Sequence, residues 1–126
     1  MRVGAKLQSE NRKQMRKSLR CPAAVKWSDG TLTHTHTLDI SSGGVSIAVP
    51  RPISGLGACH LAFVVLLPTG ARNFMANCEI THCILSGVEG FRVGLRFLDL
   101  NADDRAQLEQ VCQGHEQVPV KLKVFS

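Results

Sequence analysis

Short strand-like runs, each ended by a turn sequence, constrain the fold of this chain more than any other feature. A period of two is typical of a β-strand with one buried face. Six such runs occur, at residues 23–28, 32–40, 45–49, 58–67, 74–85 and 91–98, separated by Gly- and Pro-containing turns. Six strands with short connections favour a closed or nearly closed sheet, because closure removes exposed edges. The expected fold is therefore mainly β, a six-stranded antiparallel β-barrel.

Two of the runs are long enough to predict which side chains share a face of the sheet. Strict alternation in residues 32–40 places on one face Leu32, His34, His36, Leu38 and Ile40. The opposite face of that run carries Thr33, Thr35, Thr37 and Asp39. In residues 74–85 the side chains in phase are Phe74, Ala76, Cys78, Ile80, His82 and Ile84. We expect each face to keep its phase along the strand.

One helix is predicted after the last strand. Asn101 can cap it, and Asp103 and Asp104 in the first turn lie near the positive end of the helix dipole. Its apolar stripe consists of Leu108, Val111 and Cys112, and Gly114 ends it. We expect this C-terminal helix to plug or flank the barrel. In the tail that follows, Val118, Val120, Leu122 and Val124 alternate, as in a further strand.

The positive charge of the chain is concentrated at its N-terminal end. Residues 1–26 carry eight Lys or Arg and one acid, which is +7, whereas the remainder carries seven bases and nine acids, which is −2. Residues 1 to about 19 have no sustained apolar period, so we predict a flexible basic arm. On charge alone, a solubilising tail and a segment that meets an anionic partner are equally good interpretations.

Cysteine usage and hydropathy indicate a cytoplasmic protein, or the cytoplasmic domain of a membrane protein. The five cysteines are an odd, scattered set without a CxxC pair, which argues against a disulfide framework. The longest apolar stretch, residues 61–67, is too short to span a bilayer, and basic residues interrupt the N-terminus where a signal peptide would be apolar. Zinc is not expected, because the alternation points Cys78 and His82 to one side and Cys83 to the other.

Two short motifs carry the functional prediction. Arg16 and Arg20 form an RxxxR arginine motif just before the first strand, and Asp39, Ser41 and Gly44 form a DxSxxG aspartate motif at a strand end. Each alone has a plain interpretation, since arginines are common in solvated arms and Asp-x-Ser-x-x-Gly is an ordinary turn. Their order and their places on matching elements make the pair informative.

With both motifs, the chain resembles the PilZ domain family. The resemblance covers residues 15–112 and includes Arg20-Cys21-Pro22 before the first strand and Gly94-Leu95-Arg96-Phe97 in the last. It implies a PilZ-like split barrel that binds cyclic di-GMP without catalysing a reaction and without a cofactor. The implied organisation is a flexible basic arm at 1–14, the barrel domain at 15–112, and a tail or linker at 113–126.

The chemistry of cyclic di-GMP fits the residue types of both motifs. Its two guanines and two phosphodiesters suit Arg16 and Arg20, because a guanidinium can bind guanine O6 and N7, stack on a base and pair with phosphate. Lys17 adds weaker attraction for phosphate. Ionised Asp39 only accepts hydrogen bonds, so it suits the N–H donors of guanine.

The rest of the aspartate motif has a less specific chemistry. Ser41 could donate its hydroxyl to a phosphate oxygen or stabilise the turn. Gly43 and Gly44 leave room for backbone amides to approach an anion. Met15, before the first arginine, cannot bind a second stacked nucleotide as a guanidinium would, which favours one nucleotide per domain, although Lys17 or Arg12 could compensate.

The predicted mechanism is a switch in which the ligand orders the arginine arm and signals to an effector protein or fused effector domain. The resemblance implies outputs such as cellulose or alginate synthesis, biofilm formation or motility, including regulation of a larger polysaccharide synthase. Two alternatives stay open: a PilZ-fold adaptor that binds no nucleotide, and a basic β-barrel that binds nucleic acid. The polymer alternative is weaker, because one Trp, five Phe and no Tyr make no interleaved stacking platform. The oligomeric state is open.

Overall fold

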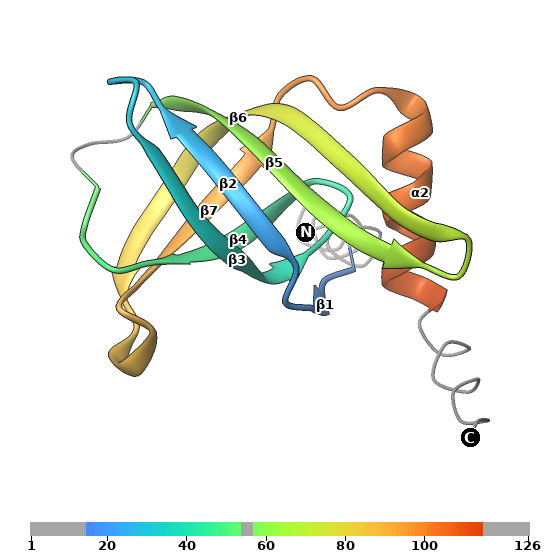
Figure 1. Ribbon diagram of the computed structural model, residues 1–126, viewed down its shortest axis with the longest axis horizontal. Helices are drawn as coiled ribbons and strands as arrows, with labels where there is room; N and C mark the ends of the chain where they lie inside the picture. Colours follow the sequence, from blue (N-terminus) through green and yellow to red (C-terminus); the bar gives the residue numbers. More distant parts are fainter. Residues whose placement is uncertain (1–14, 54–56, 115–126) are drawn as a thin grey trace, which may run out of the picture.

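The computed structural model describes residues 15–53 and 57–114 and confirms a mainly β fold with one C-terminal helix (Figure 1). The strands are β1 (Lys17–Ser18), β2 (Pro22–Trp27), β3 (Leu32–Ile40), β4 (Gly44–Val49), β5 (Ala58–Leu67), β6 (Gly70–Leu85) and β7 (Phe91–Phe97). A 3₁₀ turn, η1 (Gly87–Glu89), precedes β7, and helix α2 (Ala102–Gly114) follows it.

Six of the strands close into an antiparallel barrel in the order β3-β2-β5-β6-β7-β4, and the pairing of β3 with β4 joins the two ends. The predicted six-stranded barrel is therefore confirmed. A short extra strand, β1, pairs with the last two residues of β3. The sequence did not indicate β1, because two residues are too few to show a period.

The barrel interior is filled by the inward side chains of its strands. Phe63 and Phe74 stack at 5.2 Å between ring centroids, and Phe63 lies 6.2 Å from Phe97. Val25, Ile47 and similar aliphatic residues close the space around these rings. Burial of this continuous apolar cluster is the main source of the domain's stability.

A β-bulge in β3 corrects the predicted faces of residues 32–40. The register of β3 on β4 shifts between Thr37 and Asp39, so Leu38 is an additional residue. Thr37 and Ile40 are both fully buried as a result, although they are three positions apart. The prediction that Ile40 shares a face with His34 and His36 was wrong, because the bulge reverses the phase of the strand.

A second bulge corrects the predicted face of residues 74–85. Phe74, Ala76, Cys78 and Ile80 point into the core as expected, but the register of β6 on β7 shifts between Ile80 and His82. Beyond this shift His82 and Ile84 are exposed, whereas Cys83 packs against the core. The prediction that His82 shares the face of Cys78 was therefore wrong. No cluster of three metal-ligating side chains occurs in residues 15–53 and 57–114.

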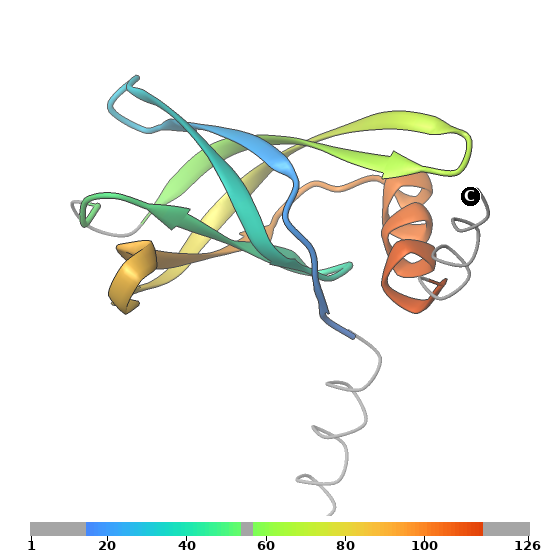
Figure 2. The ribbon, with the colours of Figure 1, turned by 60° about the horizontal axis from the view of Figure 1, so that its bottom comes forward.

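Helix α2 flanks one end of the barrel, and the hairpin of β5 and β6 reaches over it (Figure 2). The Asn101 side chain caps the helix as predicted, since its Oδ1 accepts a hydrogen bond from the Asp104 N–H at 2.7 Å. Leu108 is fully buried, and the Cys112 thiol donates to the Ile40 carbonyl at 3.3 Å. On the hairpin, Arg72 Nη2 donates to Asp104 at 2.6 Å. These contacts fix the helix to the strand that carries the aspartate motif.

All five cysteines are free thiols. Among the described helices, none is long and apolar enough to cross a membrane. The predicted flexible arm at 1–14 and the possible strand at 118–124 lie outside the described residues, and the domain boundaries stay predictions.

Candidate functional site

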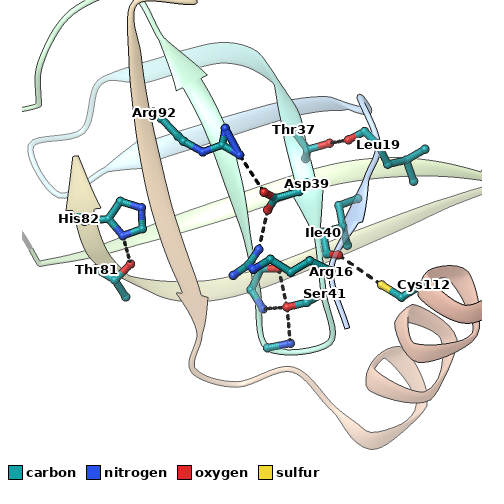
Figure 3. Close-up of polar contacts among 12 residues, drawn as sticks. Arg16, Leu19, Thr37, Asp39, Ile40, Ser41, Thr81, His82, Arg92 and Cys112 are labelled. Atoms are coloured by element: carbon teal, nitrogen blue, oxygen red, sulfur yellow. Dashed lines mark hydrogen bonds and ion pairs between the residues drawn. The ribbon is translucent and has the colours of Figure 1, made fainter. Parts of the chain in front are cut away.

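Asp39 is the centre of a three-residue ion-pair cluster on the outside of the barrel (Figure 3). Its Oδ1 accepts a hydrogen bond from Arg16 Nη1 at 2.5 Å, and its Oδ2 accepts one from Arg92 Nη2 at 2.8 Å. The Asp39 side chain is 14% exposed, whereas Arg16 is 52% exposed. Both carboxylate oxygens therefore accept a hydrogen bond, one from Arg16 just before β1 and one from Arg92 on β7.

Arg20 lies beside this cluster and contacts β3, the strand that also carries Asp39. Its Nη1 is 2.5 Å from Nε2 of His36 on β3. Because a guanidinium is always a donor, Nε2 is the acceptor in this contact. Arg20 and Arg92 also line an open hollow of about 400 Å³, together with Ser18, Leu19 and Leu38. The hollow is a concave surface with two guanidinium groups at its walls.

Backbone and side-chain hydrogen bonds attach the arginine motif to the barrel. The Leu19 N–H donates to the Leu38 carbonyl at 3.2 Å, and the Thr37 N–H donates to the Cys21 carbonyl at 2.9 Å. The buried Thr37 hydroxyl donates to the Leu19 carbonyl at 2.5 Å and accepts from the Cys21 N–H at 2.9 Å. Arg16 and Arg20 therefore flank a segment that is already bound to β3.

Ser41 is turned inward and stabilises the turn between β3 and β4. Its side chain accepts hydrogen bonds from the Gly43 and Gly44 amides, both at 3.1 Å, and the Ser41 residue is 1% exposed. Arg105 of α2 donates to the Ser42 carbonyl at 3.0 Å and ties the same turn to the helix. Of the two roles open to Ser41 from the sequence, this geometry corresponds to the second, stabilisation of the turn.

Gly44 has a steric role that the sequence did not suggest. A Cβ at this position would lie 2.1 Å from the backbone oxygen of Leu95 on β7. Glycine here permits β4 and β7 to approach closely where they pair. The glycine of the aspartate motif is thus required by the barrel itself.

Lys17 lies next to Arg16 on β1 but does not line the hollow in the described part of the chain. It is close to α2, where burial raises the pKa of the Cys112 thiol and the positive charges of Lys17 and Arg16 oppose that rise. Its position favours a long-range electrostatic role rather than direct contact.

The structure brings Arg16, Arg20 and Asp39 together and places Ser41, Gly43 and Gly44 in the turn that supports Asp39. Arg92 is not among the site residues expected from the sequence. One sequence feature points to Arg92: in the alternating strand, Phe91 and Val93 are expected to face the core, so Arg92 between them faces outward. Its contact with Asp39 depends on the pairing of β4 with both β3 and β7, which a single sequence does not reveal.

Comparison with known proteins places this geometry in a family context. The family described as "PilZ domain" matches residues 10–114. No curated protein sequence matches the chain.

Solved structures share the fold at low sequence identity. The inhibitor of motility MotI (DgrA) of Bacillus subtilis superposes with a TM-score of 0.69 at 16% identity, over 79% of this chain and 47% of that one. Escherichia coli YcgR in complex with c-di-GMP gives 0.64 at 17% identity, over 85% and 46%. The PilZ domain of CeSA from a cellulose-synthesizing bacterium gives 0.52 at 18% identity, over 77% and 93%. The chain spans about half the length of MotI and YcgR.

Proposed function

The chain belongs to the PilZ domain family, and from this membership and the arrangement of its arginines we propose that it is a receptor for cyclic di-GMP. PilZ domains are regulatory binding domains rather than catalysts. The observation that carries the proposal is that Arg16 and Arg92 both pair with Asp39 and that Arg92 lines one hollow with Arg20. The solved structure of YcgR, which shares the fold, contains this nucleotide.

In the proposed complex, Asp39 accepts hydrogen bonds from the Watson–Crick edge of one guanine. This requires Arg16 to leave Asp39 Oδ1, while Arg92 keeps Oδ2 in place. An ion pair with an exposed arginine contributes at most about 1 kcal/mol, so the exchange costs little. Arg16 is then free to bind guanine or a phosphate.

Arg20 is proposed to hold the other side of the nucleotide. It already lines the hollow, and moving from His36 to a phosphate exchanges a neutral acceptor for a charged one. Lys17 adds electrostatic attraction, and Ser41, Gly43 and Gly44 contribute by keeping the turn rigid. The nucleotide is thus clamped between the arginine motif and the outer wall of the barrel.

Lys17 and Ser18, which lie between the two arginines, pair with the end of β3. In the switch that we propose, the nucleotide orders the arginine motif against the barrel by exchanging the contacts of Arg16 and Arg20, and so alters the surface offered to an effector. The effector is a separate protein or a fused domain, and its output is exopolysaccharide synthesis, biofilm formation or motility.

Calorimetric titration of cyclic di-GMP into the wild type and into Arg16→Ala and Arg20→Ala tests the proposal. Each variant is expected to bind at least about tenfold more weakly, because each loses a charge-assisted hydrogen bond. Arg51→Ala is the matched control, since Arg51 is exposed and outside the hollow. Equal affinities for all four proteins would remove the proposal. Tighter binding of single-stranded DNA than of cyclic di-GMP would favour the polymer-binding alternative.

A further inference from the structure

The contact between Arg20 and His36 can form in only one protonation state of the histidine. Arg20 Nη1 lies 2.5 Å from His36 Nε2. A guanidinium has only donors, so Nε2 must be without a proton to accept this hydrogen bond. Protonation of the ring would place a second donor and a second positive charge against the guanidinium. His36 therefore holds Arg20 only while its ring is neutral.

Strand register brings the two side chains together and fixes the backbone around them. His36 is opposite Pro22, the first residue of β2, and Arg20 precedes Pro22 by two positions. Beside Arg20, the Leu19 N–H donates to the Leu38 carbonyl of β3 at 3.2 Å. The Arg20 side chain can therefore exchange one partner for another by rotation about its own bonds, without movement of β2 or β3.

The surroundings of His36 are mainly cationic in the part of the chain that the structure describes. On β3 and the segments that flank it, the other ionisable side chains are Arg16, Lys17, Arg20, Cys21, Lys26, His34 and Asp39. Strand β4 adds none, and beyond it β7 adds Arg92. The one carboxylate of this set, Asp39, already accepts hydrogen bonds from Arg16 and Arg92. A proton on His36 therefore increases the positive charge beside the hollow.

We propose that His36 is a positioning residue for Arg20: its neutral ring holds Arg20 on β3, and its protonated ring releases Arg20 to bind an anion in the hollow. Histidine is the side chain whose charge ordinarily changes between about pH 5 and pH 8. The coupling to cyclic di-GMP rests on the function proposed above. In the complex Arg20 has moved to the nucleotide, so the ring is free to take up a proton that the Arg20 contact excludes.

The sign of the pH dependence follows from this exchange. The complex binds more protons than the free protein, so nucleotide affinity rises as the pH falls. Calorimetric titration at pH 8 and at pH 5.5 is expected to show binding at least about fivefold tighter at the lower pH, a range in which carboxylates ordinarily stay ionised. A residue with a purely structural role would not produce this profile.

Three variants separate His36 from the other histidines. His36→Gln keeps an acceptor for Arg20 but takes up no proton, so it is expected to bind cyclic di-GMP at both pH values as the wild type does at pH 8. His36→Lys carries a permanent charge and is expected to bind at pH 8 as tightly as the wild type at pH 5.5. His34→Gln is the matched control, because His34 projects from the same face of β3 but is opposite Ala24. It is expected to keep the wild-type pH dependence.

A second measurement needs no nucleotide. In ¹H–¹⁵N spectra of the free protein, the Arg20 Nε–Hε resonance is expected to shift with the same midpoint as the His36 ring, and to stay in place in His36→Gln. Wild-type pH dependence of nucleotide binding in His36→Gln, or an Arg20 resonance that ignores the protonation of His36, would overturn the proposal. Failure of cyclic di-GMP to bind at either pH would reject the receptor function, and the Arg20 resonance would then decide alone whether His36 releases Arg20.

Discussion

Asp39 binds two arginines of different kinds, and the two can be separated by mutation. Arg16 comes from the arm, whereas Arg92 comes from the rigid strand β7. Because Arg92 both holds the Asp39 carboxylate and lines the hollow, we expect Arg92→Ala to weaken cyclic di-GMP binding about tenfold. Calorimetry measures the change.

Arg96 provides the matched control for that prediction, because it also points outward from β7 but pairs with Glu79 outside the hollow. Arg96→Ala is expected to bind cyclic di-GMP like the wild type. Arg92→Lys is expected to bind with intermediate affinity, since it keeps the charge but loses the planar fork. Wild-type affinity in Arg92→Ala would show that Asp39 needs no second arginine.

Replacement by alanine is expected to destabilise the barrel much more at one glycine than at another. In Gly44→Ala the new Cβ meets the Leu95 backbone oxygen, which cannot move without separating β4 from β7. In Gly94→Ala it meets the His82 and Thr81 side chains, which are exposed and can rotate. We expect a loss of about 3 kcal/mol in unfolding free energy for Gly44→Ala and less than about 1 kcal/mol for Gly94→Ala. Urea unfolding followed by Trp27 fluorescence distinguishes the two, and equal losses would contradict the steric explanation.

At the residue scale, local motifs could be identified from the sequence, whereas the roles of their residues in binding a ligand stay predictions. Arg16, Arg20 and Asp39 were named from their spacing and from the family resemblance, and the structure brings them together. Arg92 was missed because its role depends on which strands become neighbours. The steric need for Gly44 was missed for the same reason, since Leu95 is distant in sequence.

At the element scale, the cap of α2 offers a direct test of how the helix supports the site. Asn101→Ala removes the acceptor for the Asp104 N–H, and we expect a loss of about 1 kcal/mol in unfolding free energy. Asn101→Asp is the control, because it retains an oxygen acceptor and adds a favourable charge at the helix N-terminus. A loss in Asn101→Asp as large as that in Asn101→Ala would show that the cap contributes nothing.

The elements themselves were predictable, but their irregularities were not. Alternation and turn residues located the six barrel strands, and the Asn101 cap with the apolar stripe located the helix. The bulges at Leu38 and Thr81 were missed, because a bulge changes pairing with a neighbouring strand and leaves no clear mark in the strand's own residues. The missed bulges account for the wrong face assignments of Ile40 on β3 and of His82 and Ile84 on β6.

At the scale of the whole molecule, the buried thiols make stability depend on alkaline pH. Burial raises the pKa of Cys78 to about 12 and that of Cys59 to about 11, against an ordinary value of 9.0. Above pH 9 the unfolded chain therefore loses protons that the folded barrel retains. We expect the unfolding free energy to decrease between about pH 9 and pH 12, by up to about 1.4 kcal/mol per pH unit for each thiol.

Urea unfolding at a series of pH values checks this dependence, and the chain has no tyrosine to add its own titration in the same range. Cys78→Ala is the control, since it is expected to lower stability at every pH but to reduce the slope above pH 9. An unchanged slope in that variant would assign the alkaline loss to other groups, such as lysines.

The closed barrel could be predicted as a whole because several independent features of the sequence favour the same fold. Short strands, turn residues between them and an apolar inner face all favour closure. What the sequence left open is the outside of the barrel, where Leu66 and Met75 are as exposed as polar residues. The period of a single strand does not predict which exposed apolar side chains lie next to one another. That becomes known only when the neighbouring strands are identified.

The additional residue in β3 also has a consequence for how this domain can vary in length. Because Leu38 is the additional residue, its deletion would restore regular alternation from Thr37 to Ile40 and keep the Asp39 carboxylate outside the barrel. A single deletion in the regular part of β3 would instead reverse the orientation of every residue beyond it. Loss of one residue is therefore expected to be tolerated at the bulge and not elsewhere in the strand, a pattern that related sequences can be searched for.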